Sequence, residues 1–152
     1  MHFSDQDRFF MESAMELAME SFLKDEVPVG AVVVKENKII GSGRNTVISD
    51  NDVSSHAEIN ALRSASKELN NFRLNGCSIY VTLEPCHMCA KAIVDARLDM
   101  LVFAAKEPKT GSICSIDNFL ENKALNHSVK YKFGLSEDIS ANLLKDFFKQ
   151  KR

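Results

Sequence analysis

Two cysteines at the start of a predicted helix constrain the fold more than any other feature of this sequence. The segment 78–83 is typical of a β-strand, and Pro85 suits the first turn of a helix because its missing N–H has no partner to lose there. Cys86 and Cys89 then lie three residues apart on one helix face, so both thiols can bind one metal ion. Free N–H groups at a helix N-terminus favour thiolates, the form that binds metal.

His56 is the candidate third ligand, and Glu58 makes the metal site a candidate active site. Both lie at the start of a second predicted helix, where side chains on different helix faces can still reach one pocket. Cys77 lies at the far end of the strand, roughly 17 Å from the other two cysteines, and is a poor fourth ligand. Cys114 and His127 fall in a segment without predicted structure. A catalytic zinc leaves its fourth position to water, and Glu58 is then a candidate general base.

Length and composition fit one domain that spans residues 1–152. With 45% hydrophobic residues the chain can build a full core, and a chain of this size buries roughly two-thirds of its unfolded surface. Four unevenly spaced cysteines do not form a secreted disulfide framework. The sequence shows neither a signal peptide nor an apolar run of about 18 residues, so we expect a cytoplasmic protein without a membrane segment.

The net charge of −2 does not decide whether nucleic acid is a partner, because phosphate binding depends on local patches of charge. Lysines gather in the segment 106–132 and again at the end of the chain, from residue 145 to residue 152. A charge run by itself usually marks a solvated surface, so the distribution alone leaves the partner open.

Helical periodicity alternates with apolar strand patterns along the chain, which predicts an α/β fold. The apolar run 30–34 is typical of a buried strand, paired in a hairpin with 38–43. We expect a polar loop at 44–55 and a long functional loop at 105–128, with a short helix at 116–121. The other expected elements are a first helix from Ser4 or Asp5 to the residues before Val27, a helix from 56 to 69, a helix from Cys86, strands at 100–104 and 129–133, and a last helix opened by Ser136.

The motifs H-A-E at 56–58 and P-C-x-x-C at 85–89 are shared by zinc-dependent nucleobase deaminases. Along nearly its whole length the chain resembles the bacterial tRNA-specific adenosine deaminases, within the cytidine and deoxycytidylate deaminase superfamily. The stretches that carry this resemblance are 27–32, 56–59, 81–86, 88–90, 109–111, 126–127 and 146–148. The catalytic motifs are common to the superfamily, and the wider set is specific to the tRNA branch.

The resemblance implies a cytidine-deaminase-like three-layer α/β/α sandwich with a central mixed sheet of about five strands. It implies a homodimer that converts adenosine at the wobble position of a tRNA anticodon stem-loop to inosine. One Zn²⁺ per subunit would be held by His56, Cys86 and Cys89, and the water that it activates would attack C6 while Glu58 shuttles protons. The substrate-binding residues implied by the resemblance are Asn45, Val29 and Ala57 at the base, and Lys109, Asn126 and Phe148 near the anticodon loop.

Four positions depart from the pattern of that family. Val53 stands where a proline is usual, Ser55 where a small apolar residue is frequent, and His87 where an apolar residue is more frequent. Glu107 replaces an aspartate that faces the RNA backbone, and its longer side chain puts the details of RNA contact in question.

Three other functions compete with this hypothesis. A deaminase of a free nucleobase or nucleoside, of the guanine or cytosine type, would use the same metal chemistry. A noncatalytic RNA-binding subunit with a structural zinc would have no need of Glu58. A thiol redox protein would use Cys86 and Cys89 without metal, which leaves His56 and Glu58 unexplained.

Overall fold

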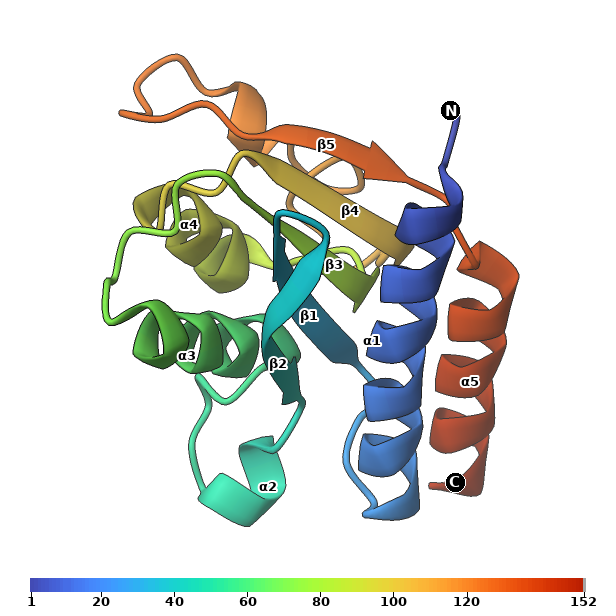
Figure 1. Cartoon of the computed structure of the whole chain (residues 1–152). Helices are drawn as coiled ribbons and strands as arrows, with labels where there is room; N and C mark the ends of the chain where they lie inside the picture. Colours follow the sequence, from blue (N-terminus) through green and yellow to red (C-terminus); the bar gives the residue numbers. More distant parts are fainter. Residues whose placement is uncertain (152) are drawn as a thin grey trace.

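Five strands form one mixed sheet, in the order β2-β1-β3-β4-β5, in the computed structural model of the protein (Figure 1). The central strand β3 (Cys77–Leu83) pairs antiparallel with β1 (Gly30–Lys35) and parallel with β4 (Met100–Ala105). The hairpin partner of β1 is β2 (Lys38–Arg44), which forms one edge of the sheet. At the other edge, β5 (Lys130–Phe133) runs parallel to β4.

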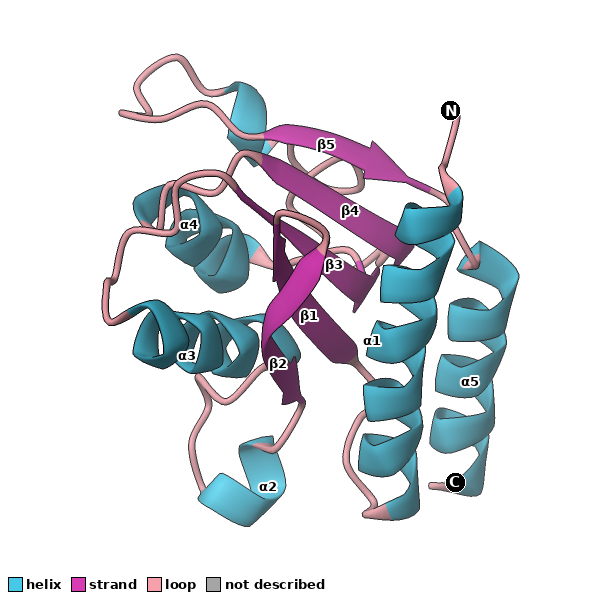
Figure 2. Ribbon diagram, in the orientation of Figure 1, coloured by secondary structure: helices cyan, strands magenta, loops and turns pink. Residues whose placement is uncertain are grey.

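Helices cover both faces of this sheet (Figure 2). α1 (Asp5–Leu23) and α5 (Glu137–Gln150) pack on one face, and α3 (Ala57–Leu69) and α4 (His87–Asp95) pack on the other. The predicted α/β/α sandwich with a mixed five-stranded sheet is therefore confirmed. The structure describes residues 1–151, and none of the helices among them is both long and apolar enough to cross a membrane.

Three local predictions need correction. The expected loop at 44–55 contains a short helix, α2 (Val47–Asp50), whose four residues are too few to show helical periodicity. The expected helix at 116–121 is only a 3₁₀ turn, η1 (Phe119–Glu121). The first helix ends at Leu23, because the chain turns through a left-handed conformation (φ 63°) two residues later.

The ends of β2, β3 and β4 and the start of β1 lie together at one end of the sheet. Leu83 pairs with Ala105, so the parallel strands β3 and β4 end side by side. Gly30 pairs with Arg44, and because β1 is antiparallel to both its neighbours, β1 begins where β2 and β3 end. Ligand sites of α/β proteins lie at the carboxyl ends of parallel strands, so this end of the sheet is the expected place for a site.

Two glycines of β2 let α3 approach the sheet backbone to backbone. A Cβ atom on Gly43 would lie 2.4 Å from the amide nitrogen of Ala61 and 2.6 Å from the carbonyl oxygen of Ala57. A Cβ atom on Gly41 would lie 2.5 Å from the amide nitrogen of Ala65. Only glycine fits these positions, and the start of α3 is consequently held at a fixed depth against β2.

The capping box of α1 joins the helix to the sheet. The Ser4 hydroxyl accepts the Asp7 N–H (3.1 Å), and the Asp7 carboxylate accepts the Ser4 N–H (2.9 Å). The Tyr80 hydroxyl of β3 donates to the same carboxylate at 2.6 Å. Burial alone would raise the pKa of Asp7, but the hydrogen bonds from Tyr80 and Ser4 outweigh it and lower that pKa below 3.8.

Substitution Gly43→Ala is expected to lower the free energy of unfolding by about 1–3 kcal/mol, because the new methyl group pushes α3 off β2. Urea unfolding followed by circular dichroism measures this. Ser42→Ala on the exposed side of the same strand is the control and is expected to stay within about 0.5 kcal/mol of wild type. A Gly43→Ala variant as stable as the wild type would show that α3 is free to shift.

Substitution Asp7→Asn is expected to remove about 1 kcal/mol of stability at pH 7 by weakening the bonds to Tyr80 and Ser4. The pKa of Asp7 is lower in the folded than in the unfolded chain, so its contribution is present above the ordinary value of 3.8. That contribution is lost as the pH falls through the pKa that Asp7 has in the folded chain. The difference in urea midpoint between wild type and variant should therefore shrink on acidification below about pH 4, and a constant difference would contradict this.

Candidate metal centre and active site

Two helices begin at the end of the sheet where β2, β3 and β4 end, and they carry the predicted ligands. His56 is the N-cap residue of α3 (φ −73°, ψ 156°), and Cys86 is the N-cap residue of α4 (φ −77°, ψ 176°). Neither side chain caps its own helix, so both remain free to face each other. Cys89 lies in the first turn of α4, which begins at His87 and not, as predicted, at Cys86.

The three predicted ligand atoms converge on one point. His56 Nδ1 lies 3.7 Å from Cys86 Sγ and 3.5 Å from Cys89 Sγ, and all three atoms lie within 4.8 Å of one another. Zn–S and Zn–N bond lengths at a tetrahedral angle place an imidazole nitrogen and a thiolate sulfur roughly 3.6 Å apart. The donor set fits a zinc ion in both chemistry and spacing.

The two thiols differ in acidity. A hydrogen bond from Cys89, with further help from His56, lowers the pKa of Cys86 to about 3. The same hydrogen bond, together with burial, raises the pKa of Cys89. The start of α4 also favours a thiolate, because its helix N–H groups favour negative charge.

Glu58 lies two residues after His56 and is only 4% exposed. Burial raises the pKa of its carboxyl group to about 7, against the opposing effect of a bond from its own backbone N–H. Glu58 lines the same cavity as His56 and Cys86. Two residues on different faces of a helix thus reach one pocket, as the sequence analysis expects for a helix seen end-on.

The cavity has a volume of about 340 Å³, within the range of small-molecule sites. The three residues predicted to contact the base, Asn45, Val29 and Ala57, all line it. Asn45 is 8% exposed and its side chain is fixed: Nδ2 donates to the Val27 carbonyl at 3.2 Å, and Oδ1 accepts the Val47 N–H at 3.1 Å. One amide hydrogen and one lone pair remain for a ligand.

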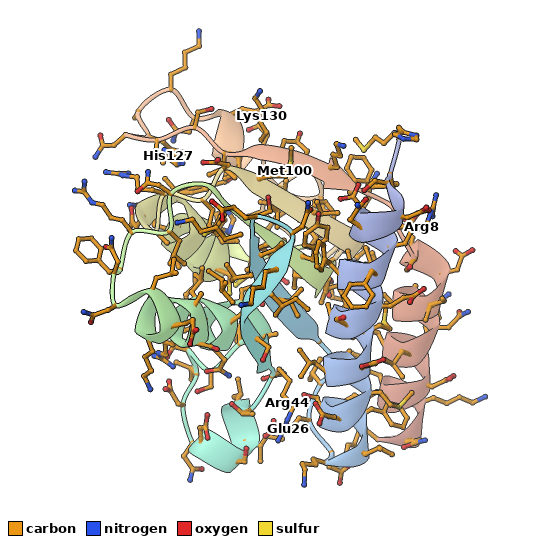
Figure 3. The ribbon with its side chains drawn as sticks, in the orientation of Figure 1. Arg8, Glu26, Arg44, Met100, His127 and Lys130 are labelled. Atoms are coloured by element: carbon orange, nitrogen blue, oxygen red, sulfur yellow. The ribbon has the colours of Figure 1, made fainter. Side chains whose placement is uncertain are left out.

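The three predicted anticodon-loop residues lie outside this cavity. Lys109 is exposed, next to Thr110, which does line the cavity. Asn126 lines a separate hollow of about 870 Å³ beside β5, bounded in part by His127 and Lys130 (Figure 3). Phe148 lies on α5 and is 49% exposed. The structure thus groups the residues predicted to bind the metal and the base, and places the three predicted RNA contacts on other parts of the surface.

The sequence analysis missed a buried carboxylate that organises the site. Glu84 is 2% exposed, and its two oxygens accept the N–H groups of Glu107 (3.1 Å), Ile113 (3.0 Å), Cys114 (2.8 Å) and Ser115 (3.0 Å), as well as the Ser115 hydroxyl. Burial alone would raise its pKa, but these bonds outweigh it and lower the pKa. Glu84 therefore folds the 107–115 loop against the start of α4.

Other cavity residues were also missed, among them Glu26, which is 2% exposed, and Ile48 of α2. The available signal was an acidic residue placed directly beside an apolar or proline-containing stretch, as in Glu26-Val27-Pro28 and Leu83-Glu84-Pro85. A carboxylate in such a setting needs hydrogen-bond donors if it is buried.

Among the positions that depart from the family pattern, His87 and Glu107 make side-chain hydrogen bonds to or within the long loop 105–128. His87 Nε2 lies 2.8 Å from Asp117 Oδ2, which links α4 to the long loop, and Glu107 accepts the Lys109 N–H at 2.9 Å. Val53 is 82% exposed and Ser55 is buried. None of the four alters the three ligand atoms.

Comparison with known proteins agrees with this geometry. A family model described as MafB19-like deaminase matches residues 4–152. The tRNA-specific adenosine deaminase of Aquifex aeolicus (strain VF5) is 42% identical over 144 residues, which cover 95% of each chain. A solved structure from a study of A-to-I editing by tRNA:A34 deaminases at the wobble position is 41% identical, with a TM-score of 0.87 over 90% of this chain and 99% of that chain.

A more distant structural relative has a different substrate. Guanine deaminase from Nitrosomonas europaea superposes with a TM-score of 0.77 at 25% identity, over 92% of this chain and 83% of that chain. Deaminases that act on different substrates thus share this fold, whereas sequence identity separates them. On this ground, the chain belongs to the family of the tRNA-specific adenosine deaminases.

Proposed function

We propose that this protein hydrolyses adenosine at the wobble position of a tRNA anticodon loop to inosine. The observation that carries the proposal is one cavity that contains His56, Cys86 and the buried Glu58 beside Asn45. The relatives named tRNA-specific adenosine deaminase supply the substrate class. In the reaction, water adds to C6, the bond from C6 to the amino nitrogen breaks, and ammonia leaves.

We propose Zn²⁺, one per subunit, as the cofactor held by His56, Cys86 and Cys89. The fit of the three donor atoms to zinc distances supports it. When bound, the ion supplies a nucleophile at neutral pH by lowering the pKa of a water molecule. Two thiolates and one neutral imidazole leave the ion nearly uncharged, so a general base is needed beside it.

Glu58 is proposed as that base. Its carboxylate lies in the cavity on the same helix start as His56, with 4% of its surface exposed, so bulk water does not compete for its proton. Glu58 takes one proton from the attacking water and delivers it to N1 of the purine; it then takes the second proton, from the hydroxyl group on C6, and delivers it to the departing amino group.

The base is proposed to lie between Val29 and Ala57, with Asn45 as its hydrogen-bond partner. Asn45 suits this role because two bonds to the backbone of Val27 and Val47 hold its amide in one orientation. A hairpin loop offers an unstacked base more cheaply than a duplex, where flipping costs a few kcal/mol.

Lys109, Asn126 and Phe148 are proposed to contact the anticodon stem-loop around the bound base. All three side chains are exposed and lie outside the cavity, so a macromolecule can reach them; Asn126 lines a hollow of its own. A lysine supplies phosphate contact, and an exposed aromatic ring offers a stacking surface.

We further propose a homodimer of single-domain subunits that acts in the cytoplasm. An apolar groove between α3 and α4 supports the dimer, since its lining includes Phe72, which is 71% exposed. An apolar surface of this kind is typical of protein–protein contact.

Incubation with a tRNA and with free purines and pyrimidines tests the substrate. Inosine at the wobble position of the tRNA, with no turnover of free guanine, cytosine or their nucleosides, is the expected result. Nucleotide analysis by mass spectrometry reads it out. Consumption of a free base alone would overturn the proposal in favour of a nucleobase deaminase.

Substitution Glu58→Ala is expected to lower the rate of inosine formation by at least about 100-fold, because the proton carrier is lost. Zinc content and tRNA binding should stay near wild type. Glu68→Ala, an exposed glutamate on the same helix, is the matched control and should keep full activity. Near-normal turnover by the Glu58 variant would sink the assigned role.

Elemental analysis of the purified protein should find about one zinc ion per chain. Cys89→Ser is expected to reduce the zinc content at least about tenfold, because a neutral hydroxyl replaces a thiolate ligand. Cys114→Ser is the control and should keep the metal, since Cys114 is not part of the converging group. A metal-free wild type would favour the redox alternative.

A further inference from the structure

Glu26 joins two segments of the molecule that are distant in sequence. It lies in the connection between α1 and β1, is 2% exposed, and lines the cavity. Its Oε1 accepts the Ile48 N–H at 3.0 Å, and its Oε2 accepts the Ser49 N–H at 2.8 Å. Both N–H groups belong to α2, so a carboxylate more than twenty residues away holds this short helix.

Glu26 supplies acceptors that the first turn of α2 lacks. The N-cap residue, Thr46, makes no side-chain capping bond to the helix; its hydroxyl donates instead to Asp50 Oδ2 at 2.6 Å. The Val47 N–H is accepted by Asn45 Oδ1, and the Asp50 N–H by the Thr46 carbonyl at 2.9 Å. The two N–H groups between them have no carbonyl partner inside so short a helix, and Glu26 accepts both.

A positive charge acts on the carboxylate of Glu26. It is that of Arg44, and Figure 3 shows the two residues beside α1 and α2. Burial alone would raise the pKa of Glu26, but the bonds from Ser49 and Ile48 and the charge of Arg44 outweigh it, so the carboxyl stays ionised. Arg44 Nη1 also donates to the Asn45 carbonyl at 3.4 Å.

The segment held by Glu26 is the wall that carries Asn45. The Asn45 carbonyl also accepts the Ser21 hydroxyl at 2.9 Å, and its side-chain Oδ1 accepts the Val47 N–H at 3.1 Å. The orientation of the Asn45 amide consequently depends on where α2 lies. Val47 and Ile48 face the cavity from the same segment.

We propose that Glu26 is a positioning residue for base binding, because its carboxylate holds the segment 45–49 as one wall of the cavity. The proposal rests on the function proposed above, in which adenosine occupies this cavity. Glu26 acts through Asn45 and α2, since both of its oxygens are already engaged by backbone N–H groups. It therefore affects affinity for the base and leaves the proton transfer of Glu58 unchanged.

Steady-state kinetics of Glu26→Gln on a tRNA anticodon stem-loop test the proposal. The amide keeps one acceptor and turns an NH₂ group toward the second N–H, so KM is expected to rise about tenfold while kcat changes less than about threefold. Glu26→Ala should raise KM further. Amide hydrogen exchange at Ile48 and Ser49 should become faster in both variants while zinc content stays unchanged.

Ser4→Ala is the matched control, because it removes the N-cap of α1 and destabilises the protein by about 1 kcal/mol far from the cavity. It should leave KM and the exchange at Ile48 and Ser49 as in wild type. An unchanged KM in Glu26→Gln, or a fall in kcat alone, overturns the proposal. Unchanged exchange at residues 48 and 49 overturns the anchoring itself, whether or not the protein is active. A wild type that forms no inosine would instead overturn the proposed function.

Discussion

The hydrogen bonds that converge on the buried Glu84 carboxylate hold together the parts of the chain on which the site depends. Glu84 follows β3 directly, and Cys86 comes two residues later, so any shift of this carboxylate moves a residue of the proposed metal site. The same oxygens fix the N–H groups of residues 107 and 113–115, which carry the loop after β4 across the cavity. Ser112 adds two bonds to the Pro85 carbonyl, from its N–H at 2.9 Å and its hydroxyl at 3.0 Å.

Glu26 has the same role on another wall of the cavity. In both places a carboxylate accepts backbone N–H groups that have no carbonyl partner in the local secondary structure. Burial of a charge is costly unless donors surround it, and here the loops themselves provide the donors. The negative charge is thereby satisfied inside the protein, which lessens its effect on a polyanionic RNA substrate.

The sequence predicts most of the architecture, because the elements that matter have strong local signals. The apolar runs of β1 and β4 identify the strands, and the motifs around His56 and Cys86 identify the helix starts and the residues that converge as a possible metal site. The helix starts are displaced by one residue, since a cap residue has the same local pattern as the first residue of a helix.

What the sequence could not predict is nonlocal. α2 is too short to show helical periodicity, and the carboxylate that binds its first turn, Glu26, lies in another part of the chain. The role of Glu84 depends on a loop that begins more than twenty residues later, and no local pattern encodes that contact. The placement of Asn126 and Phe148 outside the cavity likewise follows from how the long loop and α5 pack.

Glycines fix one helix on each face of the sheet. On the α3 face, Gly41 and Gly43 leave no side chain between helix and strand, and on the α1 face a Cβ atom on Gly30 would lie 2.0 Å from the carbonyl oxygen of Ala14. Elsewhere on the α1 face, side chains such as Phe10, Met11 and Val32 pack together, and such a layer tolerates changes of side-chain size when volume is conserved. Engineering for stability therefore has its freedom among these side chains, on the face of the sheet opposite α3, and not at the glycines.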